Sequence, residues 1–431
     1  MDLIIKGRRG KVFGELNVPG DKSISHRSVI LGALAEGDTV VKNLLISDDV
    51  LRTIKAFKDM GVGIETGDYE ILIHGVGLHG LKKAEKHIDC GNSGTTARLL
   101  SGVLSGQRFS STLVGDESLS KRPMDRVIIP LRKMGANICG KEDKYLPLEI
   151  KPVNEKLKAI RYELPIASAQ VKSAILLATL FAKGTTEIIE NKITRDHTER
   201  MLKFFGCSIK RRGKSIIMDS TVQLKGKNIY VPGDISSAAY FIVAATIING
   251  SDLLIKDVGI NPTRDGIIHV LKKMGADITI FNTRVVNNEP VGDIRIKYAP
   301  LKGISIDRKI TGIIIDEIPI LAVASSLSKG RTIIRDVREL KYKESNRLFT
   351  ITQELSKMGA KIEVFEDEMI IEGVDRLKGT EVDTHGDHRI AMALSIAALA
   401  ADGDTKIKDH ECVNISYPNF FDSLFLVYES V

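Results

Sequence analysis

The stretch Pro232-Gly233-Asp234-Ile235-Ser236-Ser237-Ala238-Ala239-Tyr240-Phe241-Ile242-Val243-Ala244-Ala245 joins a tight turn to a helix-length run of small and branched apolar residues. A helix that is apolar on all sides must be surrounded by protein. Five other turns open runs of the same kind: Gly20-Asp21-Lys22-Ser23, Gly91-Asn92-Ser93-Gly94, Pro165-Ile166-Ala167-Ser168-Ala169-Gln170, Ile315-Asp316-Glu317-Ile318-Pro319 and Gly386-Asp387-His388-Arg389. The amide groups at helix N-termini attract anions, so several such ends at one cleft would hold a small, multiply charged ligand.

A second pattern follows each buried helix. An amphipathic helix with exposed Lys or Arg ends at a glycine, and an alternating apolar segment after it predicts a strand. Five of these helix ends are Lys58-Asp59-Met60-Gly61, Arg132-Lys133-Met134-Gly135, Lys203-Phe204-Phe205-Gly206, Lys272-Lys273-Met274-Gly275 and Ser356-Lys357-Met358-Gly359, and a sixth segment, Phe420 to Phe425, closes the chain. The pattern returns every roughly 70 to 80 residues, which is too long for a solenoid. We therefore predict an α/β fold of six βαβαββ-type units.

Three buried helices at the centre of each of two domains would satisfy these burial demands. Proline and glycine mark candidate crossings between the domains at Pro19-Gly20 and Pro232-Gly233. The first strand precedes the first crossing, so it is assigned to the C-terminal half. We predict one domain over 20–228 and a second over 1–19 and 229–431, joined by a hinge of two strands.

The composition is that of a globular protein. The residues are 43% hydrophobic and 27% charged, which is ordinary for a globular protein. The length of 431 residues suits two or three domains. The net charge of +7 fits an acidic ligand, but the basic residues are spread along the chain, so nucleic acid is not an expected partner. Four isolated cysteines favour a reducing cytoplasm, and the sequence predicts neither a signal peptide nor a membrane-spanning segment.

The first two helix openings carry anion-binding chemistry. Lys22 and Arg27 are five residues apart and can reach one anion together with the hydroxyl of Ser23. Solvated charges and a capping serine are the alternative interpretation. The segment 92–96, Asn-Ser-Gly-Thr-Thr, offers amides and hydroxyls without bulk, which suits a phosphate or carboxylate, although an ordinary tight turn would have the same sequence.

Two further segments hold candidate polar groups. Arg122 precedes a proline, which denies the chain a helix there and leaves the guanidinium on a loop, where most arginines are simply solvated. Gln170 and Lys172 follow Ser168 at a buried helix start. A polar cluster that faces a core is costly unless a ligand or water pairs it. A helix cap followed by a surface lysine is the alternative.

The C-terminal half adds acids and bases. Asp316 and Glu317 open the fifth buried helix, where capping alone would explain one carboxylate. Lys343 and Arg347 share one helix face, with Glu344 adjacent, and a salt-bridged outer helix is the alternative to a binding role.

The segment 387–389, Asp-His-Arg, begins an otherwise apolar helix, so the cation of Arg389 opposes the local helix dipole and requires an anionic partner. The sequence has neither the spacing of a zinc or magnesium site nor a phosphate-binding glycine loop after a strand. We therefore expect side chains alone to neutralise the bound anions.

Taken together, these segments resemble the 5-enolpyruvylshikimate-3-phosphate (EPSP) synthase family. The resemblance spans the chain in family order and rests on Pro19-Gly20-Asp21-Lys22-Ser23-Ile24-Ser25-His26-Arg27, Gly91-Asn92-Ser93-Gly94-Thr95-Thr96, Lys121-Arg122-Pro123, Lys343-Glu344-Ser345-Asn346-Arg347 and Gly386-Asp387-His388-Arg389. Ser168 to Lys172, Arg195 to Glu199 and Asn261 to Arg264 resemble the class II form. The family fold is two inverse α/β domains of three repeats each.

The resemblance implies transfer of the enolpyruvyl group of phosphoenolpyruvate to the 5-hydroxyl of shikimate 3-phosphate, with release of phosphate, on the route to chorismate and aromatic amino acids. It implies no cofactor and no metal, and we expect a cytoplasmic monomer that binds neither nucleic acid nor membrane. Asp316, Glu344 and Lys22 are the implied catalytic residues. The implied shikimate 3-phosphate ligands are Lys22, Ser23, Arg27, Ser168, Ala169, Gln170, Arg195, Asp316 and Lys343, and those of phosphoenolpyruvate are Lys22, Gly94, Arg122, Gln170, Arg347 and Arg389, with Asn92 and His388 in support.

The chain also departs from the family pattern. Asn346 stands where many members have aspartate, and Ile415-Ser416 stands where class I enzymes carry a lysine, which argues against class I. Gly94, rather than alanine, predicts intermediate inhibition by glyphosate.

Two other functions remain open. One is the related UDP-N-acetylglucosamine enolpyruvyl transferase, which typically has Lys-Asn at the first turn and a loop cysteine. The other is a non-catalytic anion-binding or RNA-end-processing relative. Ser23 after Lys22 argues against the first, and the set Asp316, Lys343 and Glu344 argues against the second.

Overall fold

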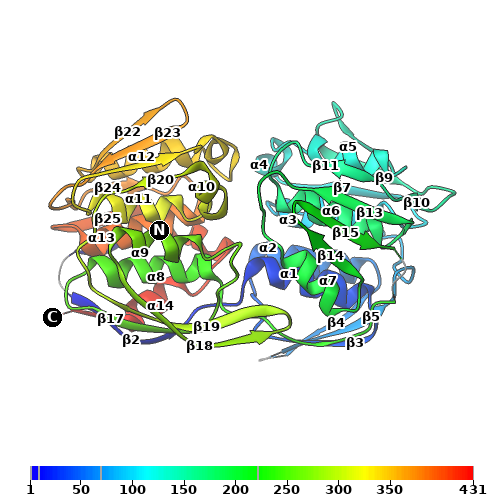
Figure 1. The fold of residues 1–431 in the computed structure, drawn as a ribbon, viewed down its shortest axis with the longest axis horizontal. Helices are drawn as coiled ribbons and strands as arrows, with labels where there is room; N and C mark the ends of the chain where they lie inside the picture. The colour runs from blue at the N-terminus through cyan, green and yellow to red at the C-terminus, as the bar shows by residue number, and fades with distance from the viewer. Residues whose placement is uncertain (1, 8–9, 68–69, 221–222, 431) are drawn as a thin grey trace. The chain divides into compact units, whose positions relative to one another are not determined.

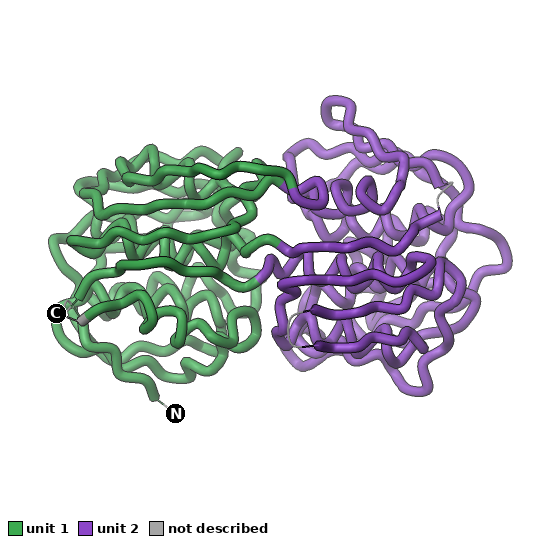
Figure 2. The backbone as a smooth tube through the Cα atoms, turned by 90° about the horizontal axis from the view of Figure 1, so that it is seen from below, with its two compact units in different colours: residues 1–19, 232–285, 290–431 green, residues 20–231, 286–289 purple. Residues whose placement is uncertain are grey.

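The computed structural model describes residues 2–7, 10–67, 70–220 and 223–430 (Figure 1). The chain forms two units, which Figure 2 distinguishes by colour. Unit 1 comprises residues 1–19, 232–285 and 290–431, and unit 2 comprises residues 20–231 and 286–289.

Unit 2 repeats one sheet topology three times. In each four-stranded sheet, the first two strands are parallel and the other pairs are antiparallel. The sheets are β16 (Asn228–Tyr230), β3 (Glu36–Lys42), β5 (Glu70–Val76) and β4 (Gly63–Thr66); β6 (Ile88–Asp89), β7 (Ser111–Val114), β9 (Tyr145–Lys151) and β8 (Asn137–Lys141); and β11 (Arg161–Glu163), β13 (Thr185–Ile189), β15 (Ser215–Asp219) and β14 (Ile209–Arg212). A parallel pair, β10 (Leu157–Lys158) and β12 (Ala182–Lys183), lies beside the third repeat in the sequence.

Each repeat of unit 2 contributes one buried and one amphipathic helix. The buried helices are α1 (Lys22–Leu34), α3 (Gly94–Leu104) and α6 (Ala169–Thr179), and the amphipathic helices are α2 (Asp48–Asp59), α5 (Asp125–Lys133) and α7 (His197–Phe204), with a short α4 (Glu117–Ser120) between α3 and α5. The side chains of Asp21, Ser93 and Ser168 cap the three buried helices by accepting backbone N–H groups. The apolar faces of all these helices pack into a single core.

Unit 1 follows the same plan with a modified third repeat. Its sheets are β18 (Asp277–Val286), β19 (Glu289–Lys297), β17 (Asp252–Gly259), β2 (Gly10–Asn17) and β26 (Tyr428–Ser430); β20 (Ser305–Ile306), β21 (Arg331–Arg335), β23 (Glu368–Glu372) and β22 (Lys361–Phe365); and β1 (Leu3–Lys6), β25 (Asp404–Lys408) and β24 (Glu381–Asp383). In the last repeat, β1 from the N-terminal segment supplies the antiparallel neighbour of β25, and β26 joins the sheet of β2 instead.

The buried helices of unit 1 are apolar around their whole circumference, as the sequence predicts. They are α8 (Ile235–Ile247), α11 (Ile318–Ser326) and α13 (His388–Ala400), and every described residue of α11 and α13 is buried. Outer helices α9 (Gly266–Met274), α12 (Arg347–Lys357) and α14 (Phe420–Val427) cover the core, and α10 (Arg308–Ile314) and the 3₁₀ helices η1 (Arg338–Tyr342) and η2 (His410–Ile415) complete the unit.

The predicted glycine stops are confirmed. Gly61, Gly135, Gly206, Gly275 and Gly359 all have left-handed φ, between 86° and 106°. Only glycine adopts this conformation without steric cost, so it ends these five amphipathic helices and redirects the chain into the following strand.

The domain boundaries differ from the predicted ones at two places. Tyr230 pairs with Lys42 in the sheet of β3, so the chain leaves unit 2 after Val231 rather than after residue 228. Residues 286–289, which comprise the turn and the adjoining ends of β18 and β19, also belong to unit 2, although the rest of both strands lies in unit 1. Both differences arise from long-range contacts that leave no local sequence pattern.

Among the described residues, no helix combines the length and the apolarity needed to cross a lipid bilayer.

Candidate active site

The predicted site residues form two groups, one in each unit. In unit 2 they lie at the beginnings of α1, α3 and α6, in the loop before α5 and just before α7. In unit 1 they lie at the beginnings of α11, α12 and α13. Figure 1 shows these helices in their units.

Lys22 is the first residue of α1. The cap of Asp21, which accepts the N–H of Ile24 at 2.9 Å, places the ammonium group of Lys22 and the hydroxyl of Ser23 in the first turn. Lys22 Nζ donates to Asp49 Oδ2 at 2.9 Å, and 18% of the lysine side chain is exposed. Asp49 therefore orients a cation that still reaches solvent.

Arg27 lies one turn further along α1 and is buried. Its guanidinium donates to the carbonyl of Ser23 at 2.8 Å, to Ser173 Oγ at 2.8 Å and to Thr198 Oγ1 at 2.6 Å. Burial lowers the pKa of Arg27 to about 10, and the charge of Arg195 adds to the decrease, while Glu199 opposes it. The cation remains charged at neutral pH and is held rigidly by three separate elements.

The beginning of α3 lies beside Arg122. Arg122 Nη2 contacts Asn92 Oδ1, and Arg122 Nη1 donates to the Asn92 carbonyl at 3.4 Å. A Cβ atom on Gly94 would lie 3.6 Å from Arg122 Nη1 and 3.1 Å from Arg98 Nη1. Glycine at this position therefore leaves room for the guanidinium of Arg98, whereas Arg122 would be only in ordinary contact with a Cβ.

The beginning of α6 is joined to α3. Ser168 caps the helix by accepting the N–H of Val171 at 3.4 Å, and Ala169 is its first residue. Gln170 donates to Thr95 Oγ1 at 3.0 Å and accepts from Arg98 Nη1 at 2.5 Å. The side chain of Gln170 is thereby fixed between the two helix openings.

Lys172 is neither a surface lysine nor a site residue. It is fully buried, and its Nζ lies 2.9 Å from Glu190 and 2.7 Å from Glu199. Two carboxylates satisfy the ammonium group inside the core, because an unpaired buried charge would be very costly. The role of Lys172 is therefore structural support for α6 and α7.

In unit 1, Asp316 precedes α11 and accepts hydrogen bonds from three cationic side chains. Its Oδ1 accepts from Lys343 at 3.0 Å and from Arg347 at 3.3 Å, and its backbone carbonyl accepts from Arg389 at 3.1 Å. Only 11% of its side chain is exposed. The carboxylate is accordingly held in one orientation.

Arg347, the first residue of α12, is the most completely enclosed of these cations. Its Nε donates to Asp387 at 2.8 Å and its Nη2 lies 2.5 Å from Glu344. Burial opposes the charged form, but Asp387 and Glu344 outweigh it and raise the pKa of Arg347. The guanidinium is permanently charged and geometrically fixed.

Arg389 has the anionic partners that its position at a helix start requires. Its Nη1 lies 3.8 Å from Glu317 Oε1, in addition to its bond to the Asp316 carbonyl. Although burial disfavours the charge, Asp316 and Glu317 raise the pKa of Arg389. Asp387 caps α13 by accepting the Arg389 N–H at 2.9 Å, and His388 is buried within the first turn.

Three residues of this environment were missed from the sequence. Asp49 pairs with Lys22, Arg98 bonds to Gln170, and Thr198 accepts from Arg27. Arg98 is the one that a local pattern could have revealed, because a charged residue inside a buried apolar helix is unusual. Asp49 and Thr198 come from other helices and have no such signature.

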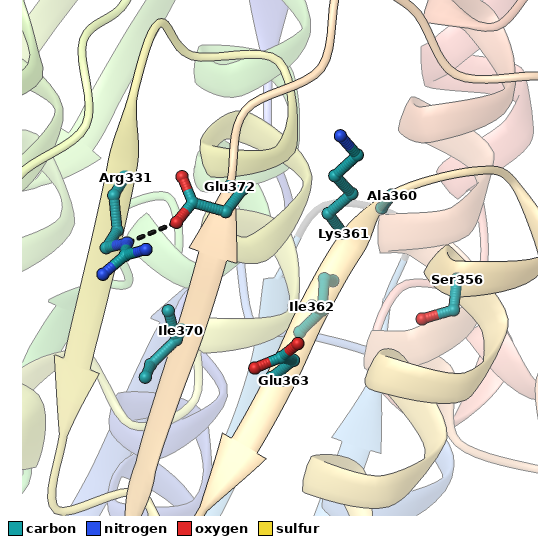
Figure 3. A pocket seen from close by; sticks show the side chains of 8 residues that line it. All are labelled: Arg331, Ser356, Ala360, Lys361, Ile362, Glu363, Ile370 and Glu372. Atoms are coloured by element: carbon teal, nitrogen blue, oxygen red, sulfur yellow. Dashed lines mark hydrogen bonds and ion pairs between the residues drawn. The ribbon is translucent and has the colours of Figure 1, made fainter.

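A pocket elsewhere in unit 1 holds none of these residues (Figure 3). It lies along β22 and β23, and its lining consists of Arg331, Ser356, Ala360, Lys361, Ile362, Glu363, Ile370 and Glu372. Within the described residues, no three His, Cys, Asp or Glu side chains are grouped so that they could hold a metal ion.

Comparison with known proteins identifies the family. The sequence model of EPSP synthase (3-phosphoshikimate 1-carboxyvinyltransferase) matches residues 7–424. The chain belongs to the EPSP synthase family.

Relatives support this over the full length. The 3-phosphoshikimate 1-carboxyvinyltransferase of Thermoanaerobacter sp. (strain X514) is 52% identical over 98% of this chain and 99% of the relative. The 3-phosphoshikimate 1-carboxyvinyltransferase of Desulforamulus reducens is 50% identical over 98% of this chain and 99% of the relative. The structure of EPSP synthase from Acinetobacter baumannii matches with a TM-score of 0.90 and 46% identity, covering 99% of each chain.

The predicted fold and reaction are therefore confirmed. The EPSP synthase fold is the mixed α/β architecture described above, and the chain is an enzyme that transfers the enolpyruvyl group of phosphoenolpyruvate to shikimate 3-phosphate in aromatic amino-acid biosynthesis. The reading as a UDP-N-acetylglucosamine enolpyruvyl transferase or as a non-catalytic relative is not favoured.

One departure from the EPSP synthase pattern has a structural explanation. Asn346 replaces the more usual aspartate and caps α12, since its Oδ1 accepts the N–H of Phe349 at 3.2 Å. Asparagine and aspartate are equally good caps, so the substitution preserves the helix start that presents Arg347.

Proposed function

We propose that the unit 2 group binds shikimate 3-phosphate through Lys22, Ser23, Arg27, Ser168, Ala169, Gln170 and Arg195. The support is chemical. The first turns of α1 and α6 present N–H groups and hydroxyls, and Arg27 and Arg195 add charge, which together suit a phosphate and several hydroxyls. Asp316 and Lys343 of unit 1 complete the proposed set.

The second substrate, phosphoenolpyruvate, is assigned to Arg122, Arg347, Arg389, Gly94, Gln170 and Lys22. Asn92 supports this set because its oxygens hold Arg122, and His388 supports it from the first turn of α13. Arginine suits the carboxylate and phosphate because its planar fork bonds both bidentately, whereas lysine acts as a point charge.

The reaction requires one base and one acid. Asp316 accepts the proton of the 5-hydroxyl as the hydroxyl oxygen forms a bond to C2 of phosphoenolpyruvate. A proton from Lys22 or Glu344 adds at the same time to the methylene carbon. In the second half, the C2–O bond to phosphate breaks, phosphate leaves, and the methyl group returns one proton, which restores the enolpyruvyl double bond.

The observation that carries this assignment is the environment of Asp316. Lys343, Arg347 and Arg389 all donate to this one residue. Lys343 and Arg347 hold the carboxylate and Arg389 holds the backbone carbonyl, so the carboxylate is oriented to receive a proton from a substrate hydroxyl. The same three cations can neutralise anionic groups of the substrates. Glu344 supplies a second carboxylate beside Arg347, with 26% of its side chain exposed and therefore accessible.

Phosphate release tests the substrate assignment directly. With phosphoenolpyruvate present, we expect release only when shikimate 3-phosphate is added and none with UDP-N-acetylglucosamine. Release that depends on the sugar nucleotide alone would overturn the assignment. Tritium exchange into the methylene group, measured in Glu344→Gln and Lys22→Met, separates the two candidate proton donors.

We further propose a cytoplasmic monomer of the class II type, without nucleic-acid or membrane partners. The four free cysteines fit a reducing compartment, and the Ser168 to Lys172 and Arg195 to Glu199 segments fit class II. Light scattering coupled to gel filtration tests the oligomeric state, and a mass of two chains would contradict it.

A further inference from the structure

The turn between β18 and β19 lies apart from every motif assigned above. Most of each strand belongs to unit 1, whereas residues 286–289, the turn and the adjoining strand ends, belong to unit 2 (Figure 2). Asn287 and Asn288 have φ of 48° and 66°. Asparagine tolerates this left-handed conformation, and two such residues in sequence are typical of a tight hairpin turn.

Side chains and backbone fasten this turn to unit 2. Asn287 Nδ2 donates to the carbonyl of Tyr230 at 2.7 Å. Arg200 Nη1 donates to the Asn288 carbonyl at 2.8 Å, and Asn288 Nδ2 donates back to the Arg200 carbonyl at 3.3 Å. The turn is therefore bonded to helix α7 and to β16.

Glu289 follows the turn and is almost completely buried. Its Oε1 lies 2.8 Å from His197 Nδ1, with each side chain 3% exposed, and its Oε2 lies 3.9 Å from Arg200 Nε. Because a carboxylate only accepts hydrogen bonds, Nδ1 is the nitrogen that carries the hydrogen. Burying a carboxylate costs free energy because the charge loses its hydration, and its hydrogen bonds to partners must offset this cost. The positions of those partners, His197 and Arg200, are therefore fixed by Glu289.

These two partners belong to the first turn of α7, which carries part of the proposed phosphate site. Arg195 lies two residues before α7, and Thr198 Oγ1 accepts from Arg27 Nε at 2.6 Å and contacts Ser173 Oγ at 2.6 Å. A shift of this turn would move both Arg195 and the hydroxyl that orients Arg27.

We propose that Glu289 is a positioning residue for the shikimate 3-phosphate site, acting through His197 and Arg200 on the first turn of α7. This inference rests on the proposed function of Arg27 and Arg195. Glu289 also lies close enough to Arg27 for its charge to oppose the lowering of the Arg27 pKa that burial causes.

The test is equilibrium binding of shikimate 3-phosphate to Glu289→Gln, followed by steady-state kinetics. The amide keeps the shape of the side chain but loses its charge. We expect the Kd and KM for shikimate 3-phosphate to rise about tenfold, as loss of a charge-assisted contact implies, while kcat and the KM for phosphoenolpyruvate change less than about twofold. Equal effects on all four constants, or an unchanged Kd, would overturn the proposal.

The fold offers a matched control. Glu368 begins the second strand of the β22–β23 hairpin, as Glu289 begins that of the β18–β19 hairpin, but it pairs with Arg335 at 2.9 Å and touches no proposed site residue. Glu368→Gln should leave every constant unchanged.

A second pair of variants keeps the test decisive if Glu289→Gln does not fold. Asparagine places an N–H donor where His197 has Nδ1, whereas leucine has none, so His197→Asn should retain near-normal affinity and His197→Leu should lose it about tenfold. Equal affinities in the two would contradict the proposal.

Arg27→Gln separates the two levels of inference. If this variant binds shikimate 3-phosphate normally, the proposed site itself is wrong. If it loses affinity while Glu289→Gln does not, only the positioning role of Glu289 is wrong.

Discussion

Arg347 and Asp387 form an ion pair that is closed to water. Arg347 Nε lies 2.8 Å from Asp387 Oδ2, and the two side chains are 1% and 0% exposed. Asp387 also caps α13 through its second oxygen, which accepts the Arg389 N–H at 2.9 Å. One buried carboxylate thus fixes both the beginning of α13, which presents Arg389, and the guanidinium of Arg347.

This pair predicts a stability effect of Asp387→Asn. Asparagine still caps α13, but the buried guanidinium loses its principal counter-charge, so we expect the free energy of unfolding at pH 7 to fall by about 3 kcal/mol. Urea denaturation measures it. Asp402→Asn, which breaks a surface pair with Arg376 at 3.2 Å, should cost less than about 1 kcal/mol.

The same pair predicts a pH dependence. Burial opposes the ionised form of Asp387, but Arg347 and His388 outweigh it and lower its pKa below 3.8. The unfolded chain therefore takes up the proton first, and the stabilisation by Asp387 is complete above about pH 4 and is lost as the pH falls toward the folded pKa. The stability difference between wild type and Asp387→Asn should shrink below pH 3.8, and a difference that grows on acidification would contradict this.

Removal of the proposed acid-base groups should abolish most turnover. Asp316→Asn and Glu344→Gln keep the size of each side chain but remove its capacity for proton transfer, so kcat should fall at least about a hundredfold. Glu363→Gln, on an exposed position of β22, serves as control. Near-normal kcat in either variant would exclude that residue from its role.

Gly94→Ala should weaken phosphoenolpyruvate binding selectively. Its Cβ would lie 3.1 Å from Arg98 Nη1, so this guanidinium must shift slightly, and it would be in van der Waals contact with Arg122 Nη1 at 3.6 Å. We expect a several-fold higher KM for phosphoenolpyruvate, weaker glyphosate inhibition and an unchanged Kd for shikimate 3-phosphate. Gly312→Ala, with no atom within 4 Å of its Cβ, is the control. Wild-type inhibition as tight as in class I enzymes would refute the intermediate sensitivity predicted from Gly94.

Lys172→Met should destabilise unit 2. The substitution leaves Glu190 and Glu199 without their shared buried cation, and we expect the free energy of unfolding to fall by about 3 kcal/mol. Lys183→Met on the exposed end of β12 should have little effect. A loss no greater than that of the control would show that Lys172 is dispensable to the core.

Local patterns predicted most of the elements. Gly275 ends α9 because only glycine adopts its φ of 104° cheaply, and Ser168 caps α6 because a hydroxyl satisfies an N–H that the helix cannot. Such effects act over a few residues, so the sequence contains all that is needed to predict them. The environment of Lys172, for which the sequence left two interpretations open, could not be predicted for the opposite reason, since its partners Glu190 and Glu199 come from outside its helix.

By itself, the sequence determined the repeated α/β unit, the helix openings with their charges and the EPSP synthase family, because these follow from short-range periodicity, capping and motifs. Only the tertiary structure decided which charges meet. Arg347 pairs with Asp387, which is 40 residues away in the sequence, and Glu289 contacts His197, which is 92 residues away. The pairing of buried charges depends on desolvation and on packing between distant segments, and neither quantity is encoded in the spacing of residues along the chain.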